Sequence, residues 1–519
     1  MADVGYTIKS IKEGLEKGEF SIEEIRREYL RRIEKENPKL NAYLSVFSNQ
    51  GDANMPARQS PMLKALAGGR IPANDANILA GAPCAVKDNI LIAGEKCTAG
   101  SKILKNYIAS YDATVVSKLK KAGAVFLGKT NLDEFAMGST GENSAFGPTL
   151  NPHDHRRVAG GSSSGSGAAV AADLAVFALG SDTGGSIRAP ASFCGVVGLK
   201  PTYGLVSRYG LIAMASSFDQ IGPITKNVED AALVLNVIAG HDSLDSTSVP
   251  RNVPDYTANL GKPIEGLKVG VPKEFLGEGL DPRVNNLVQK ALSELESLGA
   301  HVDEISLPMT DYALAAYYII VPAEVSANLA RYDGIKYGYS AQEKAKSLLD
   351  VYLDSRAEGF GDEVKRRIML GTYTLSAGYY DAYYIRAQKV RALIRQDFER
   401  IFEKYDIVVG PTMSSVAPKI GELSDPLSLY MADMYTVQVN IAGLPAISVP
   451  CGFVNPVRNS PPQRPFGRAS AGAISNGVDV GGVKLPAGLQ IIGNYFDEAK
   501  ILQVAYAIEK LNIKNQISE

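Results

Sequence analysis

The chain has 519 residues, of which 45% are hydrophobic and 21% charged, so it is long enough for one large domain with additions or for two to three domains. Its 54 lysines and arginines nearly balance its 56 aspartates and glutamates, so no large single-sign field is expected to draw it onto nucleic acid or an anionic membrane. The amino terminus lacks the apolar run of a signal peptide, and no segment has 18 or more consecutive apolar residues. We therefore expect a cytoplasmic protein with no membrane partner.

The first 47 residues predict a helical segment. Apolar residues recur there at helical spacing, in two sets: Ile8, Ile11 and Leu15, then Ile22, Ile25, Tyr29 and Ile33. Ser21 and Glu24 fit a capping box at the start of the second helix. Residues 48–77 are rich in Gly, Ala, Asn, Pro and Arg, which predicts a loop or a weakly ordered insertion.

Residues 78–519 predict one large α/β domain, because short apolar strands alternate with helices as in a sheet covered by helices on its faces. The clearest strand candidates are residues 124–127, 176–179, 267–271, 407–410 and 447–449. Helices are expected at 112–122 and at 281–298, where Pro282 lies in the first turn and Gly299 just past the end. The polar stretch at 455–477 predicts a surface insertion between carboxy-terminal strands.

The cysteines and histidines predict no metal centre. The four cysteines lack C-x-x-C spacing, which indicates reduced core thiols rather than a zinc site or a disulfide framework. No H-E-x-x-H sequence occurs among the four histidines. The residues concerned are Cys84, Cys97, Cys194 and Cys451, and His153, His155, His241 and His301.

A first candidate for the chemistry is a nucleotide site, because residues 123–130 match the phosphate-loop pattern G-x-x-x-x-G-K-T. The residues before Gly123 are helical in pattern, however, which makes Gly123 a residue that ends a helix. The four residues between the glycines are apolar and fit a buried strand better than an anion cradle. An NTP-binding protein that depends on Lys129 remains the alternative from a different functional class.

A second candidate is a nucleophile elbow, because residues 161–165 match G-x-S-x-G. An elbow needs a core strand before it, and the preceding NPHDHRRVAGG is polar. Only His241 and His301 follow it in the chain, each just past an apparent helix. The match is therefore poor.

A third candidate combines three stretches, GAPCAVKDNI, GGSSSGSGAAVAA and GSDTGGSIRAP. Lys87 follows an apolar run, and burial can lower a lysine pKa by as much as ~3–5 units, which would make it a base. The second stretch carries serines on a glycine-rich turn before a helix. In the third, Gly184 and Gly185 allow consecutive N–H groups to be exposed beside Ser186, where they could hold an oxyanion. Taken alone, the first stretch could simply carry an ion-paired lysine, the second could be a linker and the third could be a tight turn.

Together and in this order, the three stretches resemble the amidase signature family, whose members use a serine–serine–lysine triad. The resemblance runs from about Gly81 onward and implies a mixed central sheet covered by helices on both faces. It also implies that Ser186 is the acyl-forming nucleophile, Ser162 the bridging serine and Lys87 the base. Residues Thr183, Gly184 and Gly185 match the oxyanion-hole segment.

Further segments, among them MGSTGENSAFGPTLNP and NIAGLPAISVPCG, are similar to the amidase subunits of tRNA-dependent amidotransferases. That similarity implies a heterotrimer in which this chain hydrolyses glutamine and passes ammonia to a partner subunit. The partner would activate a misacylated tRNA with ATP and Mg, a small third subunit would stabilise the assembly, and this chain would need no cofactor. Arg366, with Arg367 as the alternative, and Asp433 would hold the charged ends of glutamine.

Two departures from the family pattern stand out. The glycine-rich motif reads GGSSSGSG, so Ser164 replaces a usual glycine, and we expect altered loop rigidity rather than lost chemistry. The insertion at 455–477 separates strands that a short turn normally joins. A free-standing amidase that lacks the Arg366 and Asp433 pocket, and a scaffold subunit without catalysis, remain alternatives. The tRNA acceptor, glutamyl or aspartyl, would be chosen on another chain.

Overall fold

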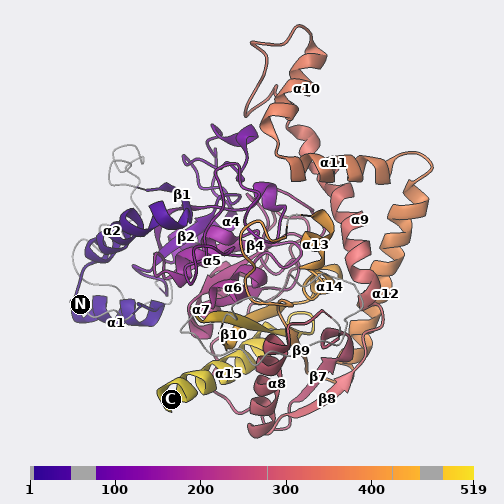
Figure 1. Ribbon diagram of the computed structural model, residues 1–519. Helices are drawn as coiled ribbons and strands as arrows, with labels where there is room; N and C mark the ends of the chain where they lie inside the picture. The colour runs from indigo at the N-terminus through magenta and orange to yellow at the C-terminus, as the bar shows by residue number, and fades with distance from the viewer. Residues whose placement is uncertain (1–4, 48–77, 278, 424, 456–482, 519) are drawn as a thin grey trace.

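The computed structural model describes residues 5–47, 78–277, 279–423, 425–455 and 483–518 (Figure 1). The predicted loop at 48–77 and nearly all of the predicted insertion at 455–477 lie outside these residues. In the described part of the chain, eleven strands form one sheet in the order β1-β3-β2-β4-β6-β5-β10-β11-β9-β7-β8. They are β1 Tyr43–Val46, β2 Pro83–Lys87, β3 Val125–Thr130, β4 Phe177–Asp182, β5 Val197–Lys200, β6 Gln220–Thr225, β7 Lys268–Pro272, β8 His301–Ile305, β9 Ile407–Pro411, β10 Ala446–Val454 and β11 Leu485–Gly493.

The sheet is mixed. β2 runs parallel to β3 and β4, and β7 runs parallel to β8 and β9, whereas β6, β5, β10, β11 and β9 are joined by antiparallel pairings. All five strands named from the sequence are present, as are the helices predicted at 112–122 and 281–298. The α/β class and the mixed sheet are therefore confirmed.

Helices cover both faces of this sheet. Along β9, Ile407 and Val409 belong to one hydrophobic core, while Val408 between them belongs to a second. Because successive strand residues point to opposite faces, the two cores lie on opposite sides of the sheet. The helices are α1 Ile8–Lys17, α2 Ile22–Leu40, α4 Thr114–Lys121, α5 Ser164–Ala171, α6 Arg188–Cys194, α7 Val228–Ile238, α8 Pro282–Ser297, α9 Thr310–Asn328, α10 Leu348–Gly359, α11 Asp362–Leu375, α12 Arg386–Phe402, α13 Pro426–Met431, α14 Val437–Ala442 and α15 Glu498–Ser518.

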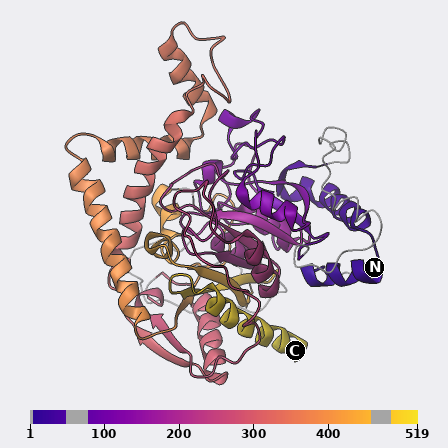
Figure 2. The ribbon, with the colours of Figure 1, turned by 180° about the vertical axis from the view of Figure 1, so that it is seen from behind.

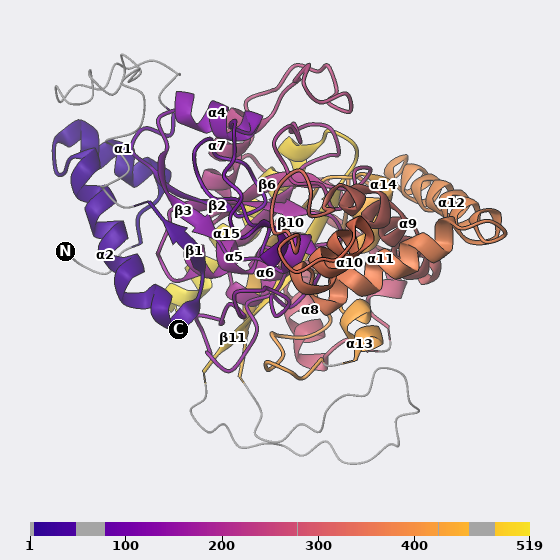
Figure 3. The same ribbon diagram turned by 90° about the horizontal axis from the view of Figure 1, so that it is seen from above.

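The amino-terminal helices form as predicted, and the capping box of Ser21 and Glu24 is present. The same segment also contributes β1, which pairs antiparallel with β3 and which the sequence did not reveal. Seen from above, α1 and α2 lie on one side of the molecule and α9 to α12 on the other (Figure 3).

Helices α9 to α12 form an arm in which α10 and part of α11 project from the body (Figures 1 and 2). By length and composition alone, residues Thr310–Arg331 could cross a membrane, but half of that helical stretch is buried in the fold. Its apolar side chains belong to the second core, where α9 packs against α11, α12 and α14. Packing within the protein thus accounts for its composition.

The phosphate-loop alternative is wrong, because the G-K-T part of its motif lies inside strand β3. Gly123 follows α4 with a φ of 85°, as expected of a glycine that ends a helix. The Lys129 side chain is fully buried and its Nζ lies 3.0 Å from an Asp88 carboxylate oxygen. This lysine is a structural cation with no path to a phosphate.

Candidate active site

Lys87 ends β2, which lies between β3 and β4 inside the sheet. Its side chain is fully buried. The Nζ atom donates to the hydroxyl oxygens of Ser162 at 2.7 Å, Ser163 at 2.9 Å and Ser181 at 2.9 Å, and lies 3.3 Å from the Ser181 carbonyl oxygen. The structure therefore surrounds this amine with hydroxyl groups and pairs it with no carboxylate of the residues it describes.

Burial lowers the pKa of Lys87 to about 7, against the opposing influence of the charges on Asp133, Asp182 and Asp219. A lysine with such a pKa is largely neutral just above pH 7. Its nitrogen then carries a free electron pair and can accept a proton from a neighbouring hydroxyl.

Of the hydroxyls that contact Lys87, that of Ser162 has no other hydrogen bond among the described residues, whereas that of Ser181 also accepts from Asn89 at 3.0 Å. The Ser163 hydroxyl already donates to the Ser181 carbonyl at 3.2 Å and accepts from the Ser181 N–H at 3.3 Å. Ser162 makes its side-chain hydrogen bond with Lys87, and the Gly161–Ser162 peptide is cis. The Ser164 hydroxyl, at the position expected to be glycine, donates to Thr149 Oγ1 at 3.2 Å. That bond ties the serine loop to a neighbouring segment.

The loop that carries Ser186 is built around a buried ion pair. Asp182 ends β4, and its two carboxylate oxygens lie 3.0 and 3.1 Å from the guanidinium of Arg188. The same carboxylate accepts the backbone N–H groups of Gly185 at 2.8 Å and Ile187 at 3.1 Å. Burial would raise the pKa of Asp182, but the charge and hydrogen bonds of Arg188 hold it well below its ordinary value. An ionised Asp182 thus shapes the loop.

The predicted oxyanion segment has little room for side chains. A Cβ atom on Gly184 would lie 2.4 Å from Tyr317 Oη, and one on Gly185, whose φ is 135°, would lie 2.4 Å from Thr436 Oγ1. Because the Gly185 N–H donates to Asp182, it is not available to an oxyanion in this conformation. The N–H groups of Thr183, Gly184 and Ser186 make no hydrogen bond to a residue that the structure describes. They are the open donors of the loop.

Ser186 is the accessible member of the predicted triad, with 7% of its surface exposed, whereas Ser162 and Lys87 are fully buried. Its carbonyl oxygen accepts the Ser163 N–H at 3.1 Å, so the two serine loops lie side by side. No hydrogen bond within the described ranges joins the Ser162 and Ser186 hydroxyls. A proton relay between them therefore requires the two hydroxyls to come within hydrogen-bond distance when substrate binds.

Asp433 lies between α13 and α14 in a polar cluster. Its carboxylate accepts the Ser139 hydroxyl at 2.5 Å and the Tyr318 hydroxyl at 2.7 Å. Burial raises the pKa of Asp433 to about 6, although both hydroxyls and the charge of Arg367 favour the ionised form. The Thr436 hydroxyl, one helical turn further on, donates to the Gly184 carbonyl at 2.5 Å. The Thr436 hydroxyl thereby links the segment that carries Asp433 to the loop that carries Ser186.

The structure brings Arg367, not Arg366, to this cluster. The Arg367 guanidinium is buried over the rings of Tyr318 at 5.3 Å and Tyr430 at 5.5 Å, and its Nε donates to Glu363 at 2.7 Å. Arg366 pairs with the same glutamate, but 38% of its side chain is exposed. Adjacent residues on a helix point about 100° apart, so only one of the two can face Asp433. The first choice from the sequence, Arg366, lies on the outer side.

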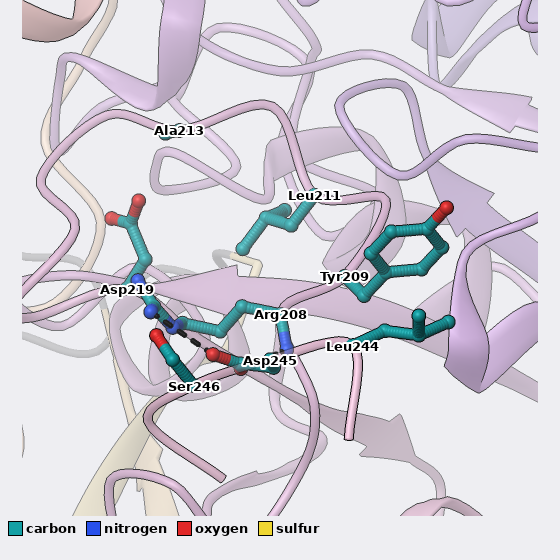
Figure 4. Close-up of a pocket in the computed structure, with 8 residues that line it drawn as sticks. All are labelled: Arg208, Tyr209, Leu211, Ala213, Asp219, Leu244, Asp245 and Ser246. Atoms are coloured by element: carbon teal, nitrogen blue, oxygen red, sulfur yellow. Dashed lines mark hydrogen bonds and ion pairs between the residues drawn. The ribbon is translucent and has the colours of Figure 1, made fainter. Parts of the chain in front are cut away.

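A pocket of about 200 Å³ adjoins the Ser186 loop (Figure 4). Asp219 connects them, because it lines the pocket and its carboxylate accepts the Thr183 hydroxyl at 2.7 Å. Burial raises the pKa of Asp219 to about 6. The other lining residues are Arg208, Tyr209, Leu211, Ala213, Leu244, Asp245 and Ser246.

Several site residues escaped the sequence analysis. Asp182 and Arg188 lay within a motif already singled out, and a buried acid and base six residues apart could have suggested a pair. Ser139 and Tyr318 gave no local signal, because they reach Asp433 from segments more than a hundred residues away.

The sequence profile described as Amidase matches residues 24–502. The chain belongs to the amidase family. This amidase is 56% identical over 506 residues to a glutamyl-tRNA(Gln) amidotransferase subunit from Caldanaerobacter subterraneus, covering 97% of this chain and 96% of that one. The crystal structure of a glutamyl-tRNA(Gln) amidotransferase subunit from Thermotoga maritima is 42% identical, with a TM-score of 0.75, over 97% of this chain and 94% of that one. Native peptide amidase from Stenotrophomonas maltophilia is 30% identical, with a TM-score of 0.75, over 97% and 96% of the two chains.

Proposed function

We propose that this amidase is the glutamine-hydrolysing subunit of a tRNA-dependent amidotransferase and supplies ammonia for the conversion of Glu-tRNA(Gln) to Gln-tRNA(Gln). The observation that carries the proposal is the buried Lys87 amine, 2.7 Å from the hydroxyl of Ser162, whose loop is hydrogen-bonded to that of the accessible Ser186. Full-length similarity to two glutamyl-tRNA(Gln) amidotransferase subunits supports the choice of glutamine as substrate.

In the proposed reaction, neutral Lys87 accepts the Ser162 hydroxyl proton while Ser162 accepts the proton of Ser186. The Ser186 oxygen attacks the side-chain amide carbon of glutamine, and the developing oxyanion is held by the N–H groups of Gly184 and Ser186. The nitrogen leaves as ammonia once it has taken a proton back through Ser162. Water then attacks the Ser186 ester, which releases glutamate and restores the hydroxyl.

The charged ends of glutamine would bind at the other side of the site. Asp433 suits the α-ammonium and Arg367 suits the α-carboxylate, since each offers the opposite charge in a buried setting. Tyr318 contacts both side chains, by a hydrogen bond to Asp433 and beneath the Arg367 guanidinium. This assignment supports a free amino acid as substrate and replaces Arg366 by Arg367.

The proposed partners rest on the similarity to glutamyl-tRNA(Gln) amidotransferase subunits. A second subunit would bind the misacylated tRNA and activate it with ATP and Mg, and a small third subunit would stabilise the heterotrimer, so that this chain itself needs no cofactor. The formal net charge of −2 is consistent with a tRNA-binding surface on another subunit. Four buried free cysteines favour a reducing compartment, which we take to be the cytoplasm.

A free-standing amidase is the second candidate, because a peptide amidase shares the fold over nearly the whole chain. Glutamine hydrolysis by the purified chain, alone and with its partner subunits, tests the choice. We expect glutaminase activity that Ser186→Ala abolishes and that the partner subunits enhance. Full activity in Ser186→Ala would refute the mechanism. Hydrolysis of simple amides with none of glutamine would favour the free-standing enzyme.

A further inference from the structure

One short segment, residues 133–139, joins the two halves of the proposed site. At its start, the Asp133 N–H donates to the Ser162 carbonyl at 3.2 Å. At its end, the Ser139 hydroxyl donates to Asp433 at 2.5 Å. Between them, Glu134 reaches the amino terminus of α11, the helix that carries Arg367. We call residues 133–139 the connecting segment.

Glu134 caps α11 from outside. Gly361 is the N-cap residue of that helix and has no side chain with which to cap it. The Glu134 carboxylate, in a residue only 2% exposed, accepts the Gly361 N–H at 2.8 Å and also accepts the Ser101 hydroxyl. A carboxylate at this end of a helix satisfies an otherwise orphaned donor and interacts favourably with the helix dipole. Glu134 thus supplies what the helix's own sequence lacks.

A second contact fixes α11 further along. A Cβ atom on Gly371 would lie 1.8 Å from the Pro322 carbonyl oxygen of α9, so the two helix backbones touch there. Arg367 lies between this crossing and the Gly361 cap. A helix held at both points keeps Arg367 in place, whereas one held only at the crossing can pivot and carry the guanidinium away from Asp433.

The backbone beside Glu134 is also held in an unfavourable conformation. Phe135 and Ala136 have φ values of 49° and 63°, in the left-handed region that residues with a Cβ avoid. The Phe135 ring packs on Phe360, the residue before Gly361, with 5.8 Å between centroids. Such conformations persist only where the surroundings enforce them, and they gather at functional sites.

We propose that Glu134 is a positioning residue for substrate binding, which holds Arg367 opposite Asp433 by capping α11. The proposal rests on the proposed function, since it takes the α-carboxylate of glutamine as the group that Arg367 binds. Glu134 contacts no reacting atom. Its loss should weaken glutamine binding and leave the triad intact.

The test is a double-mutant cycle on glutamine hydrolysis by the assembled complex, using wild type, Glu134→Gln, Arg367→Gln and the double variant. We expect Glu134→Gln, which keeps an acceptor oxygen but removes the negative charge from the amino terminus of α11, to raise KM about tenfold, with kcat within about twofold. In the Arg367→Gln background, Glu134→Gln should have no further effect on KM. An unchanged KM, or the same increase in both backgrounds, would overturn the proposal.

Two further variants secure the interpretation. Glu142→Gln is the matched control, because this partly exposed glutamate also accepts a glycine N–H, from Gly421 at 2.7 Å, and its KM should stay that of wild type. Gly361→Pro removes the other half of the cap at a φ of −75° that proline accepts, and its Cβ, 2.4 Å from Glu134 Oε2, also displaces the carboxylate, so KM should rise at least as much as in Glu134→Gln. If neither cap variant folds, the bond serves stability and the proposal is wrong. A wild type without glutaminase activity would instead contradict the proposed function.

Discussion

Arginine in place of Lys87 stays protonated throughout the working pH range and cannot become neutral, which tests whether this side chain acts as a base. With its pKa lowered to about 7 by burial, about 90% of Lys87 is neutral at pH 8. A lysine with the ordinary value of 10.5 would be neutral in about 0.3% of molecules at that pH. We therefore expect Lys87→Arg to lower kcat/KM by at least about 300-fold.

The pH profile of the wild type provides the assay. Because only the neutral amine accepts a proton, kcat/KM for glutamine should rise about tenfold per pH unit below 7 and level off above it. Asp133→Asn removes a carboxylate whose charge favours protonated Lys87, but burial raises the pKa of Asp133 itself to about 7, so the inflection should move to lower pH by less than about one unit. Ammonia release measured from about pH 5 to 10 would show both. A flat profile, or an inflection near 10, would refute the reasoning.

Five other substitutions test individual residues of the site. Ser162→Ala should reduce the steady-state rate of glutamine hydrolysis by about 10³-fold or more. Ser163→Ala removes a hydroxyl that already donates to a carbonyl, so it should reduce the same rate by less than about tenfold. Arg367→Lys should raise KM for glutamine well above that of Arg366→Lys, because only Arg367 is buried against Tyr318 and Tyr430. Equal values of KM in the two variants would contradict the assignment of Arg367 to the glutamine carboxylate. Gly185→Ala should lower the free energy of unfolding by about 1–3 kcal/mol and abolish activity, because the new Cβ would lie 2.4 Å from a neighbouring hydroxyl oxygen. A calorimetric measurement of wild-type stability in this variant would contradict the loop geometry.

The sequence predicts the parts of this protein that depend on local pattern. Strands such as β7 and β9 are short apolar runs, and the two ends of α8 are marked by Pro282 in its first turn and Gly299 just past its end. β1 was missed because it has only four residues and their burial does not alternate, which leaves little signal next to two strong helices. The triad could be named because its residues lie in three short motifs.

The substrate end could not be derived in the same way. Asp433, Ser139 and Tyr318 come from three distant segments, and no local pattern records that they will meet. The choice between Arg366 and Arg367 depends on the rotation of α11 about its axis, which the crossing with α9 determines. The hydrogen bond from the Gly185 N–H to Asp182 is likewise visible only in the three-dimensional structure.

The central claim is that Ser186 carries the acyl group of glutamine. The most direct measurement is mass spectrometry of peptides from the complex after acid quenching during glutamine turnover. We expect one added glutamyl group on the peptide that contains Ser186, absent in Ser186→Ala and in Lys87→Arg. A glutamyl group on Ser162, or continued turnover in Ser186→Ala, would contradict the account.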